Sequence, residues 1–286
     1  MFVRWTTIRR ANDTFVSPAR GYAPGMSEAK LALITGASSG IGRELAGEFA
    51  RSGYDLVVAA DGDAIHDVPG ELSGYGVAVQ AIQVDLRTPE GVEHLFASTV
   101  DGGRVLSAAA LNAGVGRGEM FLESELDDDL SVVDLNVRST VHLAKLVLRE
   151  MANRGAGRVL FTSSVASMMP GSYQTVYNAS KSFVQSFVKA LQDELRDSPI
   201  TVTALLPGPT NTHFFARAKM LDTPVGSGPK DDPAQVARQG FEALMRGDRQ
   251  VVASSTMSKA MGVALRVLPD PVKAAASRLL SVPARR

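Results

Sequence analysis

Two residues four positions apart, Tyr177 and Lys181, could carry proton-transfer chemistry. In a helix, this spacing puts both side chains on one face, a single turn apart. The pKa of a free tyrosine is ~10, which makes it a poor base at neutral pH, but a neighbouring ammonium group stabilises the phenolate and lowers that pKa. The pair alone is a weak signal, because the same spacing occurs on ordinary solvated helix faces.

Two further polar residues support the pair by their positions. Ser164 comes at the end of the apolar run around 158–162, thirteen residues before Tyr177, where its hydroxyl would face the same cleft. Asn136 lies in the middle of a long helical stretch, and its amide can hold a chain of water molecules. Together these residues predict an acid–base site with Tyr177 as the proton-transfer group.

A glycine-rich segment follows the first apolar run of the chain and reads Thr35-Gly36-Ala37-Ser38-Ser39-Gly40-Ile41-Gly42. A strand, a glycine turn and a helix N-terminus form an anion site, because backbone N–H groups can approach a pyrophosphate and the helix dipole favours its charge. The spacing matches neither the P-loop, whose lysine is missing, nor Gly-x-Gly-x-x-Gly. We expect a dinucleotide here; a turn needed only for tight packing is the alternative.

Two aspartates at strand ends are candidates for contacts with the adenosine half of that dinucleotide. Asp61 ends the second predicted strand, 19 residues after Gly42, the interval expected of a carboxylate that binds the ribose hydroxyls. Such a carboxylate repels a 2′-phosphate, so NAD(H) is favoured. NADP(H) is the alternative, with Arg43 as the nearby candidate for its phosphate. Asp85, which ends the third strand, could contact the adenine, and both aspartates could also be ordinary turn residues.

These residues need secondary structure that brings them to one place. From Lys30 onward, short apolar runs alternate with amphipathic stretches of helical length. The runs predict seven strands, at 31–34, 56–60, 77–84, 105–111, 158–162, 201–206 and 250–253. The amphipathic stretches predict helices at 41–52, 89–100, 127–153, 174–196 and 233–245.

The strands read as continuous apolar runs, so both of their faces are buried. This requires a parallel sheet with helices on each side. The predicted fold class is α/β, a single doubly wound Rossmann domain over residues 30–256, with no internal repeat or linker. A sheet of this kind binds its ligands at the carboxyl ends of the strands.

The two ends of the chain do not fit this pattern. Residues 1–29 are rich in arginine and lack a strand or helix period, and Met26 stands just before the first strand. We interpret them as a flexible leader or a start assigned too early, with a targeting segment as the alternative. Residues 257–286 read as a basic amphipathic tail that covers the domain or a partner subunit. Contact with a membrane surface is the alternative for the tail.

Composition excludes several classes of function. The 286 residues are 45% hydrophobic and 21% charged, as is ordinary for a globular α/β protein. Thirty Lys and Arg residues balance 30 Asp and Glu residues, which leaves no general positive field for nucleic acid. The absence of cysteine excludes disulfides and thiolate sites, and the four histidines show no metal-binding spacing. Because no apolar run is long enough to cross a membrane, we expect a cytoplasmic protein. From the absence of cysteine and the histidine spacing, we expect no bound metal.

Taken together, the motifs resemble those of the short-chain dehydrogenase/reductase family. The matching residues, in family order and spacing between about Lys30 and Ala253, are Thr35 to Gly42, Leu111 to Gly114, Asn136, Ser164, Tyr177, Lys181 and Pro207 to Thr212. The resemblance implies a sheet ordered 3-2-1-4-5-6-7 and NAD(P)-dependent interconversion of an alcohol and a carbonyl. The helices at 127–153 and 174–196 resemble those that pair subunits in this family, so we expect a homodimer or homotetramer.

The resemblance also implies a role for each matching residue. Tyr177 would transfer the proton, while Lys181 would support it electrostatically and bind the nicotinamide ribose. Ser164 would hold the substrate oxygen, and Asn136 would anchor the relay water. Tyr177 would also contact the cofactor, and further cofactor contacts would come from Asn112, Ala113, Gly114, Pro207, Gly208, Thr210 and Thr212. Leu111 stands where the family usually has the first of two adjacent asparagines, and the second is retained as Asn112.

Two other functions share part of the pattern. A non-catalytic dinucleotide-binding regulator would keep the fold but would be marked by loss of Tyr177 or Lys181. An epimerase or dehydratase of the same superfamily would usually have a different glycine turn and a larger carboxyl-terminal domain. For a dehydrogenase, the segment His213–Leu221, Val115 and Met168–Pro170 favour an apolar small-molecule substrate, although such residues could equally be ordinary packing.

Overall fold

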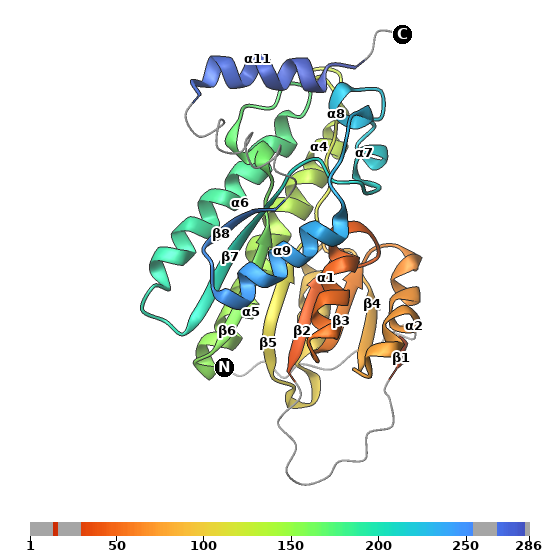
Figure 1. The fold of residues 1–286 in the computed structure, drawn as a ribbon, viewed down its shortest axis with the longest axis vertical. Coiled ribbons are helices and arrows are strands. Elements are labelled where there is room, and N and C mark those ends of the chain that lie inside the picture. The colour runs from red at the N-terminus through yellow and green to blue at the C-terminus, as the bar shows by residue number, and fades with distance from the viewer. Residues whose placement is uncertain (1–13, 17–29, 254–267, 284–286) are drawn as a thin grey trace.

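The computed structural model describes residues 14–16, 30–253 and 268–283 of the chain (Figure 1). Its centre is one sheet with the strand order β1-β4-β3-β2-β5-β6-β7-β8. The strands are β1 Thr14–Val16, β2 Leu31–Thr35, β3 Asp55–Ala60, β4 Val79–Gln83, β5 Leu106–Leu111, β6 Gly157–Thr162, β7 Ile200–Pro207 and β8 Gln250–Ala253. The strands from β2 to β8 are all parallel, and β1 pairs antiparallel with β4.

The seven parallel strands confirm the predicted fold class and the predicted order 3-2-1-4-5-6-7. The edge strand β1 is an addition that the residue pattern does not indicate. It is only three residues long and joins the sheet through backbone pairing with Val79, Gln80 and Ala81. Three residues are too few to show a period of two, so no sequence pattern marks this strand.

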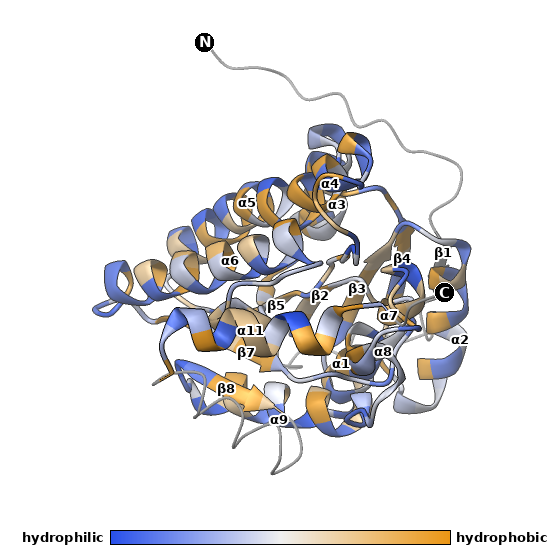
Figure 2. Ribbon diagram, turned by 90° about the horizontal axis from the view of Figure 1, so that it is seen from above, coloured by the Kyte–Doolittle hydropathy of each residue, from blue (hydrophilic) through white to orange (hydrophobic). Residues whose placement is uncertain are grey.

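Helices cover both faces of the sheet (Figure 2). The longer ones are α1 Gly40–Arg51, α3 Pro89–Val100, α4 Leu126–Val133, α5 Ser139–Arg154, α6 Thr175–Glu194, α9 Pro233–Arg246 and α11 Asp270–Ser281. Short helical segments are Asp63–Asp67, α2 Val68–Leu72, Ser73–Tyr75, Asp101–Gly103, Val165–Met168, α7 Phe214–Arg217 and α8 Pro224–Ser227. Helices α1 and α9 pack on one face, and α3, α5 and α6 pack on the other.

The core on the α1 and α9 side contains a cluster of aromatic rings around Phe49. This side chain is fully buried, and its ring meets Tyr54 and Phe241 edge to face, with centroids 5.3 and 4.9 Å apart. Phe241 belongs to α9, so the cluster joins helices that are almost 200 residues apart in the chain. Both helices are thereby held against the sheet below the glycine turn.

Replacing Phe49 with alanine removes this cluster and leaves a cavity in the core. We expect the free energy of unfolding to fall by ~3–5 kcal/mol, as is typical of a buried aromatic residue. Leu122→Ala is the matched control, because Leu122 is 90% exposed and its loss should be nearly neutral. Urea unfolding of the three proteins measures the difference, and equal stability of both variants would contradict this account of the core.

Candidate active site

The predicted glycine turn lies between β2 and α1. Gly36 and Gly40 have φ angles of +67° and +55°, which other residues rarely adopt. A Cβ on Gly42 would lie 2.2 Å from the carbonyl oxygen of Gly36, so the turn closes only with glycine there. Ser39 makes no side-chain cap at the start of α1, and the first turn of this helix holds no acid. The residues present therefore fit a pyrophosphate, whose charge suits the helix N-terminus and its N–H groups.

The Asn112 side chain joins the carboxyl ends of three strands. Its amide nitrogen donates to the carbonyl oxygen of Thr35 on β2 (3.1 Å), and its amide oxygen accepts from the hydroxyl of Thr162 on β6 (3.0 Å). The Thr35 hydroxyl accepts from the backbone N–H groups of Asn112 and Ala113, both at 3.0 Å. The glycine turn is therefore fixed relative to the strands that lead to the predicted proton-transfer residues.

Asn136 lies where the helix predicted at 127–153 changes its winding. Helices α4 and α5 are joined by a π-helical turn, Asp134–Arg138, so the prediction of one regular helix is corrected here. Such turns are frequent at functional sites. The Asn136 amide donates to the Val115 carbonyl (2.9 Å) and to the Ser180 hydroxyl (2.9 Å), and it accepts from the Val115 N–H (3.0 Å). Asn136 therefore ties the loop after β5 to α6.

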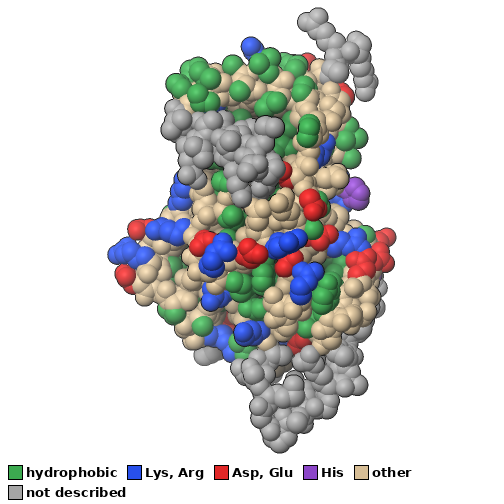
Figure 3. Space-filling view, in the orientation of Figure 1, with side chains coloured by type: hydrophobic (Ala, Val, Ile, Leu, Met, Phe, Trp, Pro, Cys, Tyr) green, Lys and Arg blue, Asp and Glu red, His purple; other side chains and the backbone are tan. Residues whose placement is uncertain are grey.

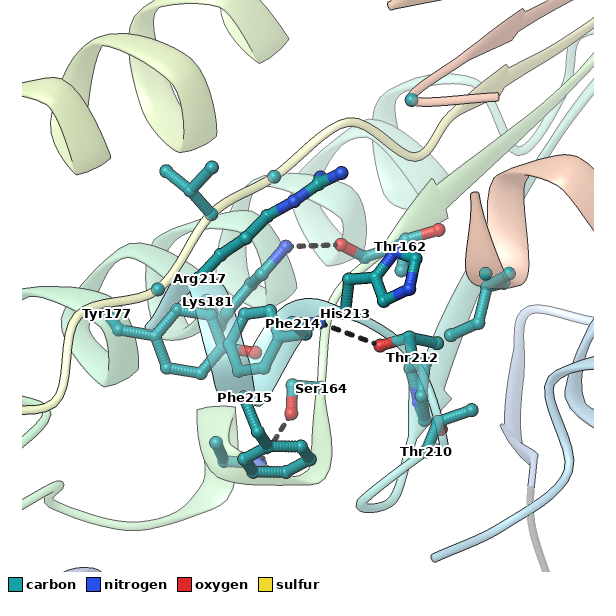
Figure 4. Close-up of a pocket in the computed structure, with 18 of the residues that line it drawn as sticks. Thr162, Ser164, Tyr177, Lys181, Thr210, Thr212, His213, Phe214, Phe215 and Arg217 are labelled. Carbon is teal, nitrogen blue, oxygen red and sulfur yellow. Dashed lines mark hydrogen bonds between the residues drawn. The ribbon is translucent and has the colours of Figure 1, made fainter. Parts of the chain in front are cut away.

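Tyr177 and Lys181 lie one turn apart on the buried face of α6 (Figure 4). Their exposed fractions are 8% and 5%. The Lys181 ammonium group donates to the carbonyl oxygen of Thr162 at 2.9 Å, and the Phe214 ring packs against the Tyr177 ring with centroids 5.1 Å apart. The geometry therefore buries a phenol and an ammonium group one helical turn apart, where water hardly reaches them.

Burial shifts the pKa of both groups toward their neutral forms. It raises the pKa of Tyr177 to about 12, against an opposing effect of the hydrogen bond with Ser164. It lowers the pKa of Lys181 to about 8. The sequence predicts a lowered pKa for Tyr177, but burial of the phenol outweighs any help from Lys181, which bonds Thr162. With these residues alone, Tyr177 is a protonated phenol at neutral pH.

A cavity of about 820 Å³ collects the predicted residues. Its lining includes Ser164, Tyr177, Lys181 and all the other predicted cofactor residues, Gly36, Ser38, Ser39, Gly40, Ile41, Gly42, Asp61, Asp85, Asn112, Ala113, Gly114, Pro207, Gly208, Thr210 and Thr212. Asn136 does not line the cavity and lies behind Gly114. A Cβ on Gly114 would be 3.1 Å from both Asn136 Oδ1 and Lys181 Nζ, so glycine lets these two groups converge.

The segment after β7 packs against the glycine turn. The Thr212 methyl group would lie 2.6 Å from a Cβ on Gly40, and Phe214 covers Tyr177 (Figure 4). His213, Phe214, Phe215 and Arg217 line the cavity as the sequence suggested, and so do Val115 and Met169. Met168 and Pro170 do not line it, and Met168 packs in the core instead.

Helix α11, within the predicted tail, contributes residues that sequence reasoning did not assign to the site. Ser277, Leu280 and Ser281 line the cavity, and Gln174 at the start of α6 donates to the Ser281 hydroxyl at 2.9 Å. The remainder of that tail, at 257–267 and 284–286, lies outside the described residues. Because a contact between residues 107 positions apart leaves no local signal, only the fold places α11 over the cavity.

The end of the cavity lined by Asp61 and Asp85, where we predict the adenosine to bind, also contains an arginine that the sequence analysis did not single out. Arg87 donates to Asp61 Oδ2 at 2.9 Å and to Asp85 Oδ2 at 3.1 Å. It stands two positions beyond Asp85, and that proximity is the signal that could have revealed it. The predicted phosphate candidate, Arg43, pairs instead with Glu71 and does not line the cavity.

Neither a membrane span nor a metal centre is found in the described part of the chain. No described helix is long and apolar enough to cross a bilayer, and no described group of three histidine, aspartate or glutamate residues could hold a metal ion. The acidic run Asp127–Asp129 lies in the first turn of α4, where Asp128 pairs with Arg117 and Asp129 accepts from Ser124.

Known proteins are similar to this chain in both sequence and fold. Residues 30–220 match the family described as short chain dehydrogenase. The oxidoreductase UcpA of Salmonella typhimurium is 33% identical over 218 residues, which are 75% of this chain and 80% of that protein. A short-chain dehydrogenase from Sphingobium yanoikuyae, solved with NADPH, is 28% identical with a TM-score of 0.73, covering 83% and 93% of the two chains. A Burkholderia phymatum member solved with NAD is 23% identical, with a TM-score of 0.77 and coverage of 91% and 99%.

These matches cover most of the chain, and the chain belongs to the short-chain dehydrogenase/reductase family. It is therefore an NAD(P)-dependent oxidoreductase that interconverts alcohols and carbonyls of small molecules. The predicted family, fold and class of enzyme are confirmed.

Lys181 should make stability depend on pH in a particular direction. Its pKa is about 8 in the folded chain and ~10.4 when unfolded, so between these values the unfolded state binds more protons. Stability contributed by Lys181 therefore rises with pH over this interval, by about 1 kcal/mol between pH ~8 and ~9. Urea unfolding of the wild type and of Lys181→Met at these two pH values measures the rise, which the variant should lack.

Lys189→Met is the control for this measurement. Lys189 is exposed on the same helix, so its variant should keep the rise of the wild type. If the stability of Lys181→Met followed that of the wild type at both pH values, Lys181 would not carry the lowered pKa.

Proposed function

We propose that Tyr177 transfers the proton in this reaction, with Ser164, Lys181 and Asn136 as its supporting groups. The observation that carries the proposal is the burial of the phenol beside the Ser164 hydroxyl and the Lys181 ammonium group in the cavity that the glycine turn opens into. The nicotinamide supplies or accepts the hydride when it is bound. The residues of the chain supply orientation and control of the proton.

Each supporting residue has a distinct task. The Ser164 hydroxyl accepts from the Ala166 N–H at 3.1 Å, and its own hydrogen would donate to the substrate oxygen. Lys181 places a positive charge one helical turn from the phenol, where it favours the phenolate. Asn136 fixes the loop after β5 against α6 and holds an amide close to Lys181, behind Gly114. A water molecule there would connect Lys181 with solvent.

For the cofactor, we favour NAD(H), because Asp61 lines the adenosine end with its side chain half exposed. A carboxylate at the end of β3 accepts hydrogen bonds from ribose hydroxyls. Asp85 is the second carboxylate at this end and would lie near the adenine. The glycine turn and the N-terminus of α1 would hold the pyrophosphate.

An apolar substrate fits the remaining part of the cavity. Phe214 packs against Tyr177, and Phe215, Met169 and Leu280 of α11 line the same cavity. Such surfaces gain free energy when they bury apolar groups. The polar hydroxyls of Ser164 and Tyr177 would then fix the position of the single reacting oxygen.

Assembly and location are the broader parts of the proposal. Leu130, Val133 and Phe183 are exposed on α4 and α6, the helices expected to pair subunits, and their apolar surface supports a homodimer or homotetramer.

Hydrophobic side chains also gather on the outer side of α11 (Figure 3), where Val272 and Leu279 are 48% and 69% exposed. These are the residues that membrane contact by the tail would use. Membrane contact and the cytoplasmic location stay predictions.

The proton-transfer role is tested by Tyr177→Phe. Removing a positioned acid–base group costs ~10²–10⁴-fold in turnover, so oxidation of NADH with a panel of apolar ketones should nearly stop. Binding of NADH, followed by nicotinamide fluorescence, should be unchanged, because the phenol hydroxyl is not part of the adenosine or pyrophosphate site. Tyr75→Phe is the control, since Tyr75 is exposed and does not line the cavity. Normal turnover of Tyr177→Phe would overturn the assignment.

A further inference from the structure

Arg87 connects the two carboxylates at the adenosine end of the cavity. One terminal nitrogen donates to Asp61 Oδ2 at 2.9 Å, the other donates to Asp85 Oδ2 at 3.1 Å, and the backbone N–H donates to Asp85 Oδ1 at 2.9 Å. Arg87, Asp61 and Asp85 all line the cavity. The guanidinium group is therefore placed between two acids that the cofactor must approach.

This arrangement changes the charge that a ligand meets. Asp61 and Asp85 alone would present two negative charges to any phosphate, and Arg87 compensates one of them. Arg87 bonds only the Oδ2 atom of Asp61, so Oδ1 remains able to accept a ribose hydroxyl. Asp63, the next acid along the chain, accepts from the Gln83 amide at 2.8 Å and does not line the cavity. The ribose site therefore keeps an acceptor without a strong negative field.

Arg87 also has donors to spare. A guanidinium group has five N–H donors, and two of them are used in the bonds to the aspartates. The Nε atom is buried, so a ligand in the cavity cannot reach it. The two remaining N–H donors belong to the terminal nitrogens of a side chain that is 32% exposed, and these are the donors that a ligand can meet. Phosphate oxygens are the acceptors that best match an arginine.

No such role is available to Arg43, the cation that the sequence suggests for a 2′-phosphate. Its side chain bonds Glu71 through Nε at 2.7 Å and through a second nitrogen, and it does not line the cavity. Of the two arginines near the adenosine end, only Arg87 reaches the surface that a cofactor would touch.

We infer that Arg87 is a specificity-determining residue that lets this chain bind NADP(H) as well as NAD(H). Asp61 Oδ1 accepts the ribose hydroxyls of NAD(H), while Arg87 offsets the charge of Asp61 and donates to the 2′-phosphate of NADP(H). The inference rests on the cofactor use set out under the proposed function. Beyond that proposal, the inference assigns the binding of NADP(H) to Arg87, on the loop after β4.

The test compares the dissociation constants of NADH and NADPH, both followed by nicotinamide fluorescence, for the wild type and for Arg87→Gln. The wild type should bind both cofactors. Arg87→Gln should raise the ratio of the NADPH constant to the NADH constant by at least about tenfold, because the variant loses a charge-assisted bond to phosphate and leaves Asp61 uncompensated. Arg87→Lys keeps the charge without the planar fork and should fall between the two.

Two matched variants sharpen the comparison. Arg43→Gln removes the other nearby cation and should leave the ratio unchanged. Asp61→Asn removes the repelling carboxylate and should lower the ratio. Thermal unfolding of each variant, with and without NADH, confirms that the cofactor still binds a folded chain.

Three results would overturn the inference, and each is distinct. A wild type that binds NADH but not NADPH would show that Arg87 does not admit the phosphate. An equal loss of both cofactors in Arg87→Gln would give Arg87 a structural role only. A change of the ratio in Arg43→Gln, but not in Arg87→Gln, would return the phosphate to Arg43. If the wild type bound neither cofactor, the cofactor site of the proposed function would fail as well.

Discussion

The hydrogen bonds of the Asn112 side chain are the constraint on which the site depends. They join the ends of β2, β5 and β6 in one network, through Thr35 and Thr162. The same Thr162 accepts from Lys181 through its carbonyl oxygen, so the network continues to the residues that we propose for proton transfer. Backbone pairing fixes the register of these strands within the sheet. Asn112 adds side-chain bonds at their carboxyl ends, and the glycine turn packs directly against its amide group.

The second constraint is the burial of Tyr177 and Lys181, the groups that we propose move and stabilise the proton. An interior without water favours the neutral phenol and the neutral amine, and it also strengthens the effect of any charge placed nearby. The site therefore favours a protonated phenol as long as no positive charge lies beside it. We propose that an oxidised nicotinamide, when bound, would supply such a charge, so that loss of the proton would depend on the cofactor. The π-helical turn at Asn136 and the glycine at 114 make room for this arrangement without opening it to solvent.

Much of the fold and of the candidate site could be predicted from the sequence, because local residue patterns determine these parts. Continuous apolar runs mark the seven parallel strands, glycine spacing marks the turn, and the interval from Tyr177 to Lys181 marks one helix face. The rest depends on contacts between distant segments. The bridge from Arg87 to Asp61, the bond from Gln174 to Ser281 and the irregular turn at Asn136 have no local signature. The raised pKa of Tyr177 could not be predicted either, since burial is a property of the packed chain.

On our proposal, burial holds the proton on Tyr177, and the positive charge of a bound oxidised nicotinamide would release it. The direct measurement is the difference in phenolate absorbance between the wild type and Tyr177→Phe, followed from neutral to alkaline pH with NAD⁺ or with NADH bound. We expect the Tyr177 phenolate to form at a clearly lower pH with NAD⁺ than with NADH, which lacks the positive ring. Identical titration with both cofactors would contradict the account.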